Sequence, residues 1–320
     1  MFDAVLVVSF GGPQGRGDIR PFLANVLRGR RVTPERVEEV ALHYELFDGV
    51  SPLTELTQRQ ADGLRQRLAA AGYRLPVYVG MRNWHPFLAD TLKKMYADGV
   101  RRAIGFIAAA HHSYSSCQQY RENVASAQQA LRNDGGHIDI TFVDSWFDHP
   151  QFIAANAALI REALKRLPGH VREDARLVFT AHSIPKSMAD ASQYEHQLSA
   201  SCAAIAAQLG LPWALVYQSR SGRPQDPWLE PDVCDYLRRE HAQGLAAAVL
   251  CPVGFVCDHI EVLYDLDREA ADLCTSIGLP MVRAAAVNDD PLFLDMMADV
   301  VLRTMRRFET GRPLPIVSQA

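Results

Sequence analysis

The chain has 320 residues, of which 48% are apolar and 22% are charged, and its formal net charge is −4. These values are typical of a globular protein long enough for two α/β domains or one large one. The lack of a basic tract argues against a nucleic-acid partner, and no apolar run approaches the length of a membrane span. The six cysteines form no CxxC pair and the N-terminal apolar run is too short for a signal peptide, so we expect reduced thiols and a cytoplasmic protein.

The first half alternates expected strands and helices. Residues 4–10 form an apolar strand that ends in Gly11-Gly12-Pro13, without the glycine pattern of a dinucleotide site or a P-loop. The next elements expected are helices at 18–27, 35–47, 52–71 and 86–98 and strands at 76–81 and 102–110. Ser51 is expected to cap the helix at 52–71. The arginines of the loop at 28–31 are either solvated or an anion site.

The second half repeats this plan. Its expected elements are strands at 176–181, 213–218 and 245–256 and helices at 190–209 and 231–241. Segments of the two halves align loosely, for example VLVVSFGGP with LVFTAHSIP. We therefore expect an α/β protein of two similar Rossmann-like halves, residues 1–147 and 148–290, each with a parallel sheet and with a cleft between them. A last helix at about 291–308 is expected to pack back on the first half.

Three carboxylates follow the last strand. Glu261, Asp265 and Glu269 are spaced so that an α-helix places them on one face, where like charges repel by about 0.2–0.5 kcal/mol per pair. A solvated acidic face and a row of oxygen ligands for a divalent cation both fit this pattern. The row begins at the carboxyl end of a strand, where α/β proteins bind ligands, and this favours metal ligands.

A histidine at another strand end is the second chemical feature. His182 and Glu261 both follow strands of the second half, so a parallel sheet opens both at the same edge. A neutral imidazole with a carboxylate suits Fe²⁺ better than Mg²⁺ or Ca²⁺, and the pair can also take protons. Taken alone, a histidine such as His182 is more often structural than a ligand, and its place at a strand end before Ser183-Ile184-Pro185 makes the two roles about equal. His259 precedes Glu261 by two positions and is expected to point elsewhere on the helix, in a structural or outer position.

Other reactive groups have simpler interpretations. His111 and His112 are adjacent, so at most one of them can face the cleft. Ser183 lacks the glycine-flanked elbow of a nucleophilic serine. Cys251 and Cys257 are expected to be buried small hydrophobes.

At these positions the sequence resembles the ferrochelatases, and the resemblance covers nearly the whole chain. It rests on FGGP (10–13), RGR (28–30), GVSPL (49–53), RNWHP (82–86), SYSSCQQY (113–120), HSIP (182–185), YQSRSG (217–222), PWLEPDV (227–233) and GFVCDHIEVLYDLD (254–267). The last of these motifs is highly specific. The resemblance implies that His182 and Glu261 are the catalytic pair at a metal-insertion site. It also implies an outer metal route through Asp265 and Glu269.

The resemblance implies porphyrin contacts as well. The expected contacts are Ser51, Tyr120, Phe10, Arg28, His43, Tyr114 and His111. Phe10 stands where many relatives have a tyrosine that can meet the metal from the opposite face, and His111 or His112 could replace it. His43 stands where some relatives have an arginine near a propionate. An apolar floor is expected from Phe10, Trp84, Tyr114, Ile184, Val253 and Phe255, with Arg28 and Arg30 at its mouth.

RNWHP and SYSSCQQY are most similar to the ferrochelatases of Gram-positive bacteria and their relatives, which act on coproporphyrin III. We therefore expect the chain to insert Fe²⁺, its second substrate, into coproporphyrin III and to form coproheme in haem b biosynthesis. The two loop arginines and the lack of an evident apolar lip favour this four-carboxylate porphyrin over protoporphyrin IX. The alternatives are a protoporphyrin IX ferrochelatase, a cobalt or nickel chelatase, and a non-enzymatic porphyrin or haem carrier. The acidic helix favours the enzyme.

No iron–sulfur cluster is expected, because the last cysteine is Cys274 and the other five lie in separate segments. We further expect a monomer that makes transient contacts with the preceding and following enzymes of the haem pathway.

Overall fold

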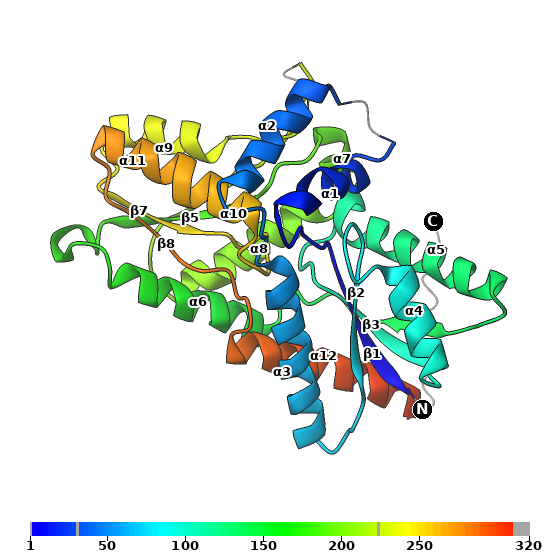
Figure 1. Cartoon of the computed structure of the whole chain (residues 1–320). Coiled ribbons are helices and arrows are strands. Elements are labelled where there is room, and N and C mark those ends of the chain that lie inside the picture. The colour runs from blue at the N-terminus through cyan, green and yellow to red at the C-terminus, as the bar shows by residue number, and fades with distance from the viewer. Residues whose placement is uncertain (1, 30–31, 223–224, 310–320) are drawn as a thin grey trace.

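The computed structural model describes residues 2–29, 32–222 and 225–309 and contains two four-stranded parallel sheets (Figure 1). The first sheet has the order β2-β1-β3-β4 and consists of β1 (Ala4–Ser9), β2 (Val77–Met81), β3 (Arg102–Ile107) and β4 (Asp139–Phe142). The second has the order β6-β5-β7-β8 and consists of β5 (Ala175–His182), β6 (Trp213–Gln218), β7 (Ala247–Cys251) and β8 (Met281–Arg283). The expected architecture of two similar α/β halves is confirmed.

Helices cover both faces of the first sheet. The helices of this half are α1 (Ile19–Val26), α2 (Pro34–Glu45), α3 (Leu53–Ala70), α4 (Leu88–Ala97) and α5 (Gln119–Asn133), of which α3, α4 and α5 cover the sheet. The apolar stripe of α4, with Leu92 and Met95, packs with α5 against Leu6 of β1. The opposite face is covered by α3 and by the last helix, α12 (Pro291–Glu309). A strand that is buried on both faces reads as a continuous apolar run, which is why residues 4–9 carry no polar alternation.

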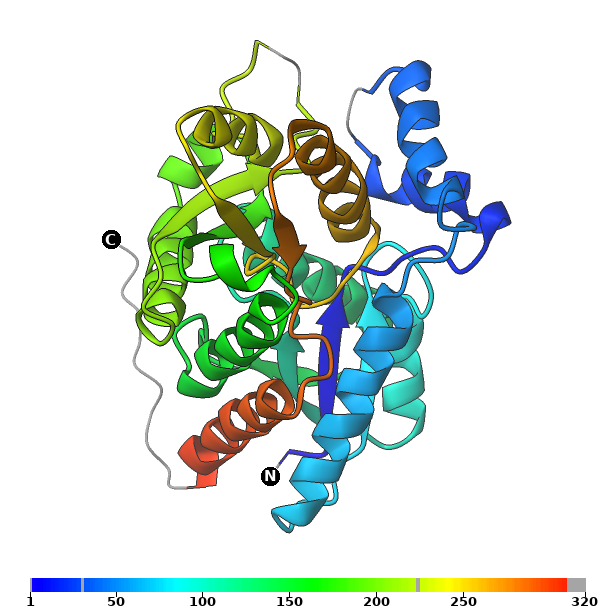
Figure 2. The same cartoon turned by 90° about the vertical axis from the view of Figure 1, so that its left-hand side faces the viewer.

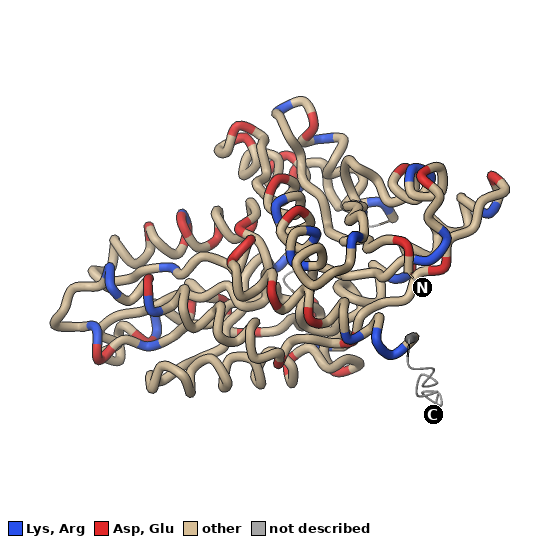
Figure 3. Tube along the Cα trace, turned by 90° about the horizontal axis from the view of Figure 1, so that it is seen from below, with Lys and Arg blue, Asp and Glu red and all other residues tan. Residues whose placement is uncertain are grey.

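The second sheet has the same layers. Its helices are α6 (Pro150–Leu164), α7 (Lys186–Asp190), α8 (Tyr194–Ala207), α9 (Val233–Ala242), α10 (Ile260–Tyr264) and α11 (Ala271–Ile277). One face is covered by α6 and α8. The other face is covered by α9 and by the helix that α10 begins, through Val262 and Leu266. Charged residues of both signs are spread over both halves (Figure 3).

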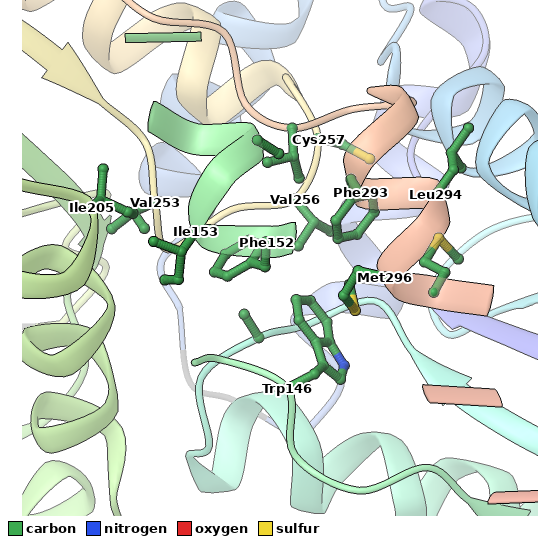
Figure 4. Packing of buried hydrophobic residues seen from close by; sticks show 14 of the residues in the cluster. Trp146, Phe152, Ile153, Ile205, Val253, Val256, Cys257, Phe293, Leu294 and Met296 are labelled. Carbon is green, nitrogen blue, oxygen red and sulfur yellow. The ribbon is translucent and has the colours of Figure 1, made fainter. Parts of the chain in front are cut away.

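One apolar core joins the two halves. Phe293 and Met296 of α12 pack beside Trp146 and Phe152, and Val256 closes the cluster from the second half (Figure 4). The helix α12 contacts α3 and β3 on one side and α6 on the other. Removing a fully buried aromatic ring such as Phe293 costs about 3–5 kcal/mol.

The helices α1 and α2 stand apart from the sheets and lie beside α10 (Figure 2). Ile260 of α10 packs among Ile19, Phe22 and Tyr44 of these two helices. The contact brings α2 over the helix that carries the carboxylates.

The structure corrects several boundaries. The helix expected at 190–209 begins only at Tyr194, as α8, because a turn at 191–193 separates it from the short helix α7 that follows Pro185. The strand expected at 245–256 ends at Cys251, since Pro252 has no N–H to continue the ladder. The strand expected at 102–110 likewise ends earlier, at Ile107. Within the described residues, no helix is both long and apolar enough to span a bilayer.

Candidate active site

His182 ends β5 at the carboxyl edge of the second sheet. Its Nδ1 lies 2.5 Å from the carbonyl oxygen of Ser183, and a carbonyl only accepts, so this nitrogen carries the proton. The lone pair of a neutral ring is therefore on Nε2. The hydroxyl of Tyr194 donates to the carbonyl of His182 at 3.0 Å and fixes the strand end. His182 thus presents a basic nitrogen to the space beyond the sheet.

Glu261 faces that nitrogen. Its Oε2 lies 3.8 Å from His182 Nε2, which is too far for a direct hydrogen bond and close enough for both groups to bind one small species. About 40% of the Glu261 side chain and 33% of the His182 side chain is exposed, so the pair is open to ligands from solution. The structure brings together the two residues that the sequence analysis paired.

His259 also lies beside Glu261, and the expectation that it points elsewhere is wrong. Its Nε2 is 3.8 Å from the same Oε2 atom. His259 precedes the helix as its N-cap, and its Nδ1 accepts the N–H of Val262 at 3.3 Å. Burial lowers the pKa of His259, although the Glu261 charge opposes this, and because Nδ1 accepts the Val262 N–H, the neutral ring carries its proton on Nε2. Recognising an N-cap at 259 would have shown that Nδ1 is occupied by the backbone and that Nε2 is the nitrogen left for another partner.

The acidic helix is not one regular α-helix. After α10 the backbone widens into a π-helical segment, Asp265–Ala270, before α11 begins. Such segments are uncommon and occur often at functional sites. The charges of Glu261 and Glu269 both raise the pKa of Asp265, so both lie within electrostatic reach of it, and we call these three residues the carboxylate row.

Asp265 is the most perturbed of the three. Burial raises its pKa to about 7, and the charges of its two acidic neighbours add to the shift. Hydrogen bonds lower the pKa of Asp265 in the opposite direction. They come from the Ser219 hydroxyl and from Gln218 Nε2, the latter at 3.1 Å. Ser219 has φ 58°, a left-handed conformation unusual for serine. Both partners come from the exit of β6, which the sequence analysis had not connected with this helix.

The outer end of the row reaches α2. Burial raises the pKa of Glu269, as does the charge of Asp232, while a hydrogen bond from Tyr264 lowers it. Tyr264 stacks on His43 of α2, with ring centroids 3.7 Å apart and planes within 13°. Burial lowers the pKa of His43. The stacked pair therefore joins the two halves beside the acidic row.

Two aromatic groups of the first half lie around Arg82. Tyr120 is buried, which raises the pKa of its phenol, and the charge of Glu261 contributes to this shift. The Arg82 guanidinium carbon lies 5.7 Å from the ring centroid of Phe10 and 5.9 Å from that of Tyr120. Phe10, Tyr120 and Arg82 thus form one group on the side of the first sheet.

Comparison with known proteins decides the family. The profile of the ferrochelatase family matches residues 2–305. The chain belongs to the ferrochelatase family. It is 47% identical over 320 residues to a protein of Streptomyces griseus named coproporphyrin III ferrochelatase, with 94% of this chain and 85% of that protein covered. It is 46% identical over 302 residues to a ferrochelatase of Rhodopirellula baltica, with the same coverage.

The fold is shared with a more distant chelatase. The cobalt complex of the sirohydrochlorin chelatase SirB from Bacillus subtilis subspecies spizizenii superimposes with a TM-score of 0.57 at 10% identity. The superposition covers 97% of this chain and 98% of that one. At this identity the likeness concerns the architecture alone.

Other residues expected to contact porphyrin in a ferrochelatase make contacts within the protein. Ser51 is buried against Gly12, where a Cβ would meet its Cβ at 2.5 Å, and its hydroxyl accepts the Leu53 N–H at 3.4 Å. Pro52, not Ser51, occupies the N-cap position of α3. Arg28 donates to Asn25 Oδ1 at 2.7 Å, and Arg30 lies outside the described residues.

Tyr114 and His111 have partners of their own. The hydroxyl of Tyr114, whose side chain is exposed, donates to Glu122 at 3.1 Å. His111 is buried with its Nε2 3.0 Å from the Ser201 hydroxyl, and its Nδ1 has no hydrogen-bond partner within the described chain. Burial lowers the pKa of His111 to about 3.

Two features of the surface were not predicted. Leu42 and Leu46 of α2, on either side of His43 in sequence, are 58% and 60% exposed. The statement that the chain has no evident apolar lip was therefore wrong. A cavity of about 240 Å³ lies between loop 144–150 and α12, away from the His182 corner. Within the described residues, no group of three or more His, Cys, Asp or Glu side chains is arranged to hold a metal ion.

Proposed function

We propose that this chain inserts ferrous iron into coproporphyrin III and forms coproheme in haem b biosynthesis. The observation that supports this most directly is that His182 and Glu261 lie 3.8 Å apart and face each other in a member of the ferrochelatase family. The substrate is taken from the Streptomyces griseus relative, whose name specifies coproporphyrin III.

Metal insertion requires the ring to lose two pyrrole protons and to buckle so that its nitrogen lone pairs meet the ion. His182 is the proposed base, because its Nε2 holds a lone pair while Nδ1 is bonded to Ser183. Glu261 is the proposed partner for the iron and for the second proton. His259 is proposed to be an outer neighbour of this carboxylate, since its Nε2 lies 3.8 Å from the same oxygen. Binding the buckled ring more tightly than the flat ring lowers the barrier.

Iron is proposed to reach the pair along the carboxylate row, past Glu269 and Asp265. Asp265 suits this task because its pKa of about 7 lets it exchange a proton for a cation near neutral pH. The ring is proposed to lie between this row and the first half. Its proposed contacts are Phe10, Ser51, Tyr120, Tyr114, His43, Arg28 and His111.

The remaining assignments are also proposals. We divide the chain into an N-terminal half, residues 1–147, and a C-terminal half, 148–290, that carries the pair. We place the protein in the cytoplasm as a monomer without an iron–sulfur cluster. The proposal of no cluster rests on the spacing of the cysteines, since Cys274 is the last of them and the other five lie in separate segments. Contacts with neighbouring enzymes of the haem pathway are proposed to be transient.

One observation favours a second candidate, protoporphyrin IX. Leu42 and Leu46 form an exposed apolar edge on α2, and protoporphyrin has more apolar edge substituents than coproporphyrin. The Rhodopirellula baltica relative is named ferrochelatase without a stated porphyrin.

Anaerobic kinetics with Fe²⁺ distinguish the two candidates. We expect kcat/KM for coproporphyrin III to exceed that for protoporphyrin IX by about tenfold or more, since each charge-assisted hydrogen bond to a ring carboxylate contributes about 1.5–3 kcal/mol. The Leu42→Ser variant should keep this preference for coproporphyrin III over protoporphyrin IX. A preference for protoporphyrin would contradict the proposed substrate, and no iron insertion with either porphyrin would contradict the proposed activity.

A further inference from the structure

Arg283, the last residue of β8, binds two separate points of the acidic helix. Its Nε and Nη2 donate to the two carboxylate oxygens of Asp267, at 2.6 and 2.7 Å. Its Nη1 donates to Asp258 Oδ1 at 2.7 Å. Asp258 precedes α10, and Asp267 lies inside the π-helical segment. One guanidinium therefore holds the chain on both sides of Glu261 and Asp265.

These contacts differ from an ordinary surface ion pair. The side chains of Arg283 and Asp258 are only 14% and 16% exposed, so solvent and salt screen this pair weakly. The Asp267 side chain is 38% exposed, and its contact is distinguished by its geometry instead. The contact with Asp267 is bidentate, a geometry that the planar guanidinium provides and a lysine ammonium cannot. The bidentate contact therefore fixes the orientation of the Asp267 carboxylate as well as its distance from Arg283.

Asp258 extends the connection into loop 284–288. Its Oδ1 also accepts the N–H of Ala286 at 3.1 Å, and its Oδ2 accepts Asn288 Nδ2 at 2.8 Å. The N–H of Asp258 donates to Asn288 Oδ1 at 2.8 Å. The carbonyl of Asn288 in turn accepts Gln60 Nε2 of α3 at 2.7 Å. The start of the acidic helix is therefore fixed to the edge strand and to the first half of the molecule.

The ion pair at Asp267 bears on the backbone conformation. A π-helical turn has less favourable packing than an α-helical turn and needs tertiary contacts to persist. The pair with Arg283 is such a contact, because Asp267 lies within the widened turn. The width of this turn sets where Asp265 lies relative to Glu261 and Glu269.

We propose that Arg283 is a positioning residue for the metal: it clamps the acidic helix at Asp258 and Asp267 and holds the carboxylate row in register with His182. Arg283 itself touches neither iron nor porphyrin. The proposal rests on the proposed function, since it assigns the row to the path of the iron. It identifies a role for a residue outside the cleft, on the edge strand of the second sheet.

Three variants test the clamp: Arg283→Lys, Asp267→Asn and the two combined. Arg283→Lys keeps the positive charge and removes the planar guanidinium that makes the bidentate contact with Asp267. The matched control is Arg238→Lys, which alters an exposed ion pair with Asp235 on α9. Each purified variant is assayed anaerobically for kcat and for KM toward Fe²⁺, and the Kd for coproporphyrin III is measured by fluorescence.

We expect Arg283→Lys and Asp267→Asn each to lower kcat/KM for Fe²⁺ by about tenfold or more, the range for residues that orient metal ligands. The Kd for porphyrin should stay within about twofold, and the control should match the wild type. The double variant should be no worse than the more affected single variant, because both changes remove the same contact.

Several results would overturn the clamp. An unchanged kcat/KM for Fe²⁺ in folded Arg283→Lys would do so, as would equal losses of iron kinetics and porphyrin binding, or the failure of both single variants to fold. A wild-type protein that inserts no iron contradicts the proposed function instead. The clamp is then judged by Zn²⁺ binding to the porphyrin-free protein, which must weaken by about tenfold in Arg283→Lys and not in Arg238→Lys.

Discussion

Replacing Asp265 with asparagine should change how the stability of the protein depends on pH. Burial raises the pKa of Asp265 to about 7 from an ordinary value of 3.8. Between these values the folded protein keeps a proton that the unfolded chain has released, so the free energy of unfolding falls as the pH rises. The fall is complete above about pH 7, where the folded protein has also lost the proton. The Asp265→Asn variant carries no such proton and lacks this fall.

The size of the difference follows from the shift. One pKa unit corresponds to about 1.36 kcal/mol, so between pH 5 and pH 8 the wild type should lose at most about 2.6 kcal/mol more than the variant. Asp265 keeps partial access to solvent, which screens its charge. We therefore expect about half of that value, roughly 1–2 kcal/mol.

The assay is urea unfolding of both proteins at four pH values from 5 to 8, with a chelator present so that no metal occupies the row. Taking the difference between the two proteins removes the contribution of groups that titrate equally in both. Asp235→Asn, on the exposed face of α9, is the matched control and should follow the wild type. If the free energy of unfolding changed with pH in the same way in the wild type and in Asp265→Asn, the claim that Asp265 is a buried, protonated carboxyl would be refuted.

Three further outcomes are expected. His182→Ala and Glu261→Gln should each lower the rate of iron insertion by about two to four orders of magnitude, the range for lost acid–base groups. Porphyrin should still bind and quench the protein fluorescence. Turnover near the wild-type rate in either variant would contradict the assignment of His182 and Glu261 as the catalytic pair. His43→Ala should lower the free energy of unfolding by about 0.5–1.5 kcal/mol in urea, because the ring stacked on Tyr264 is lost, and no change would show that the stack contributes nothing. Protein purified without oxygen should contain less than stoichiometric iron and acid-labile sulfide, and Cys257→Ser should insert iron at nearly the wild-type rate; a stoichiometric cluster would show that the thiols bind iron.

The architecture could be predicted because its strands are buried on both faces. Such strands read as apolar runs, and their alternation with helices favours parallel order. The two strands that were missed, β4 and β8, lie at sheet edges and are short, and their residues are only partly buried. A four-residue or three-residue edge strand leaves too little pattern to distinguish it from a loop.

The pair of His182 and Glu261 could be predicted because both follow strands whose carboxyl ends share one edge. Their surroundings could not. The π-helical segment depends on contacts such as that of Asp267 with Arg283, which is 16 residues away in sequence. Periodicity describes only a regular helix and therefore placed His259 on the wrong side. Local pattern contains no information on partners supplied by a distant strand.

The most direct test of the account is a single turnover of protein loaded with coproporphyrin III and mixed with Fe²⁺ in the absence of oxygen. The absorption spectrum follows conversion of the free porphyrin into coproheme. The account predicts complete conversion by the wild type and a bound but unconverted porphyrin in Glu261→Gln over the same time, slower by about two orders of magnitude or more. Conversion by Glu261→Gln at the wild-type rate would contradict the central claim that the His182–Glu261 pair performs the insertion.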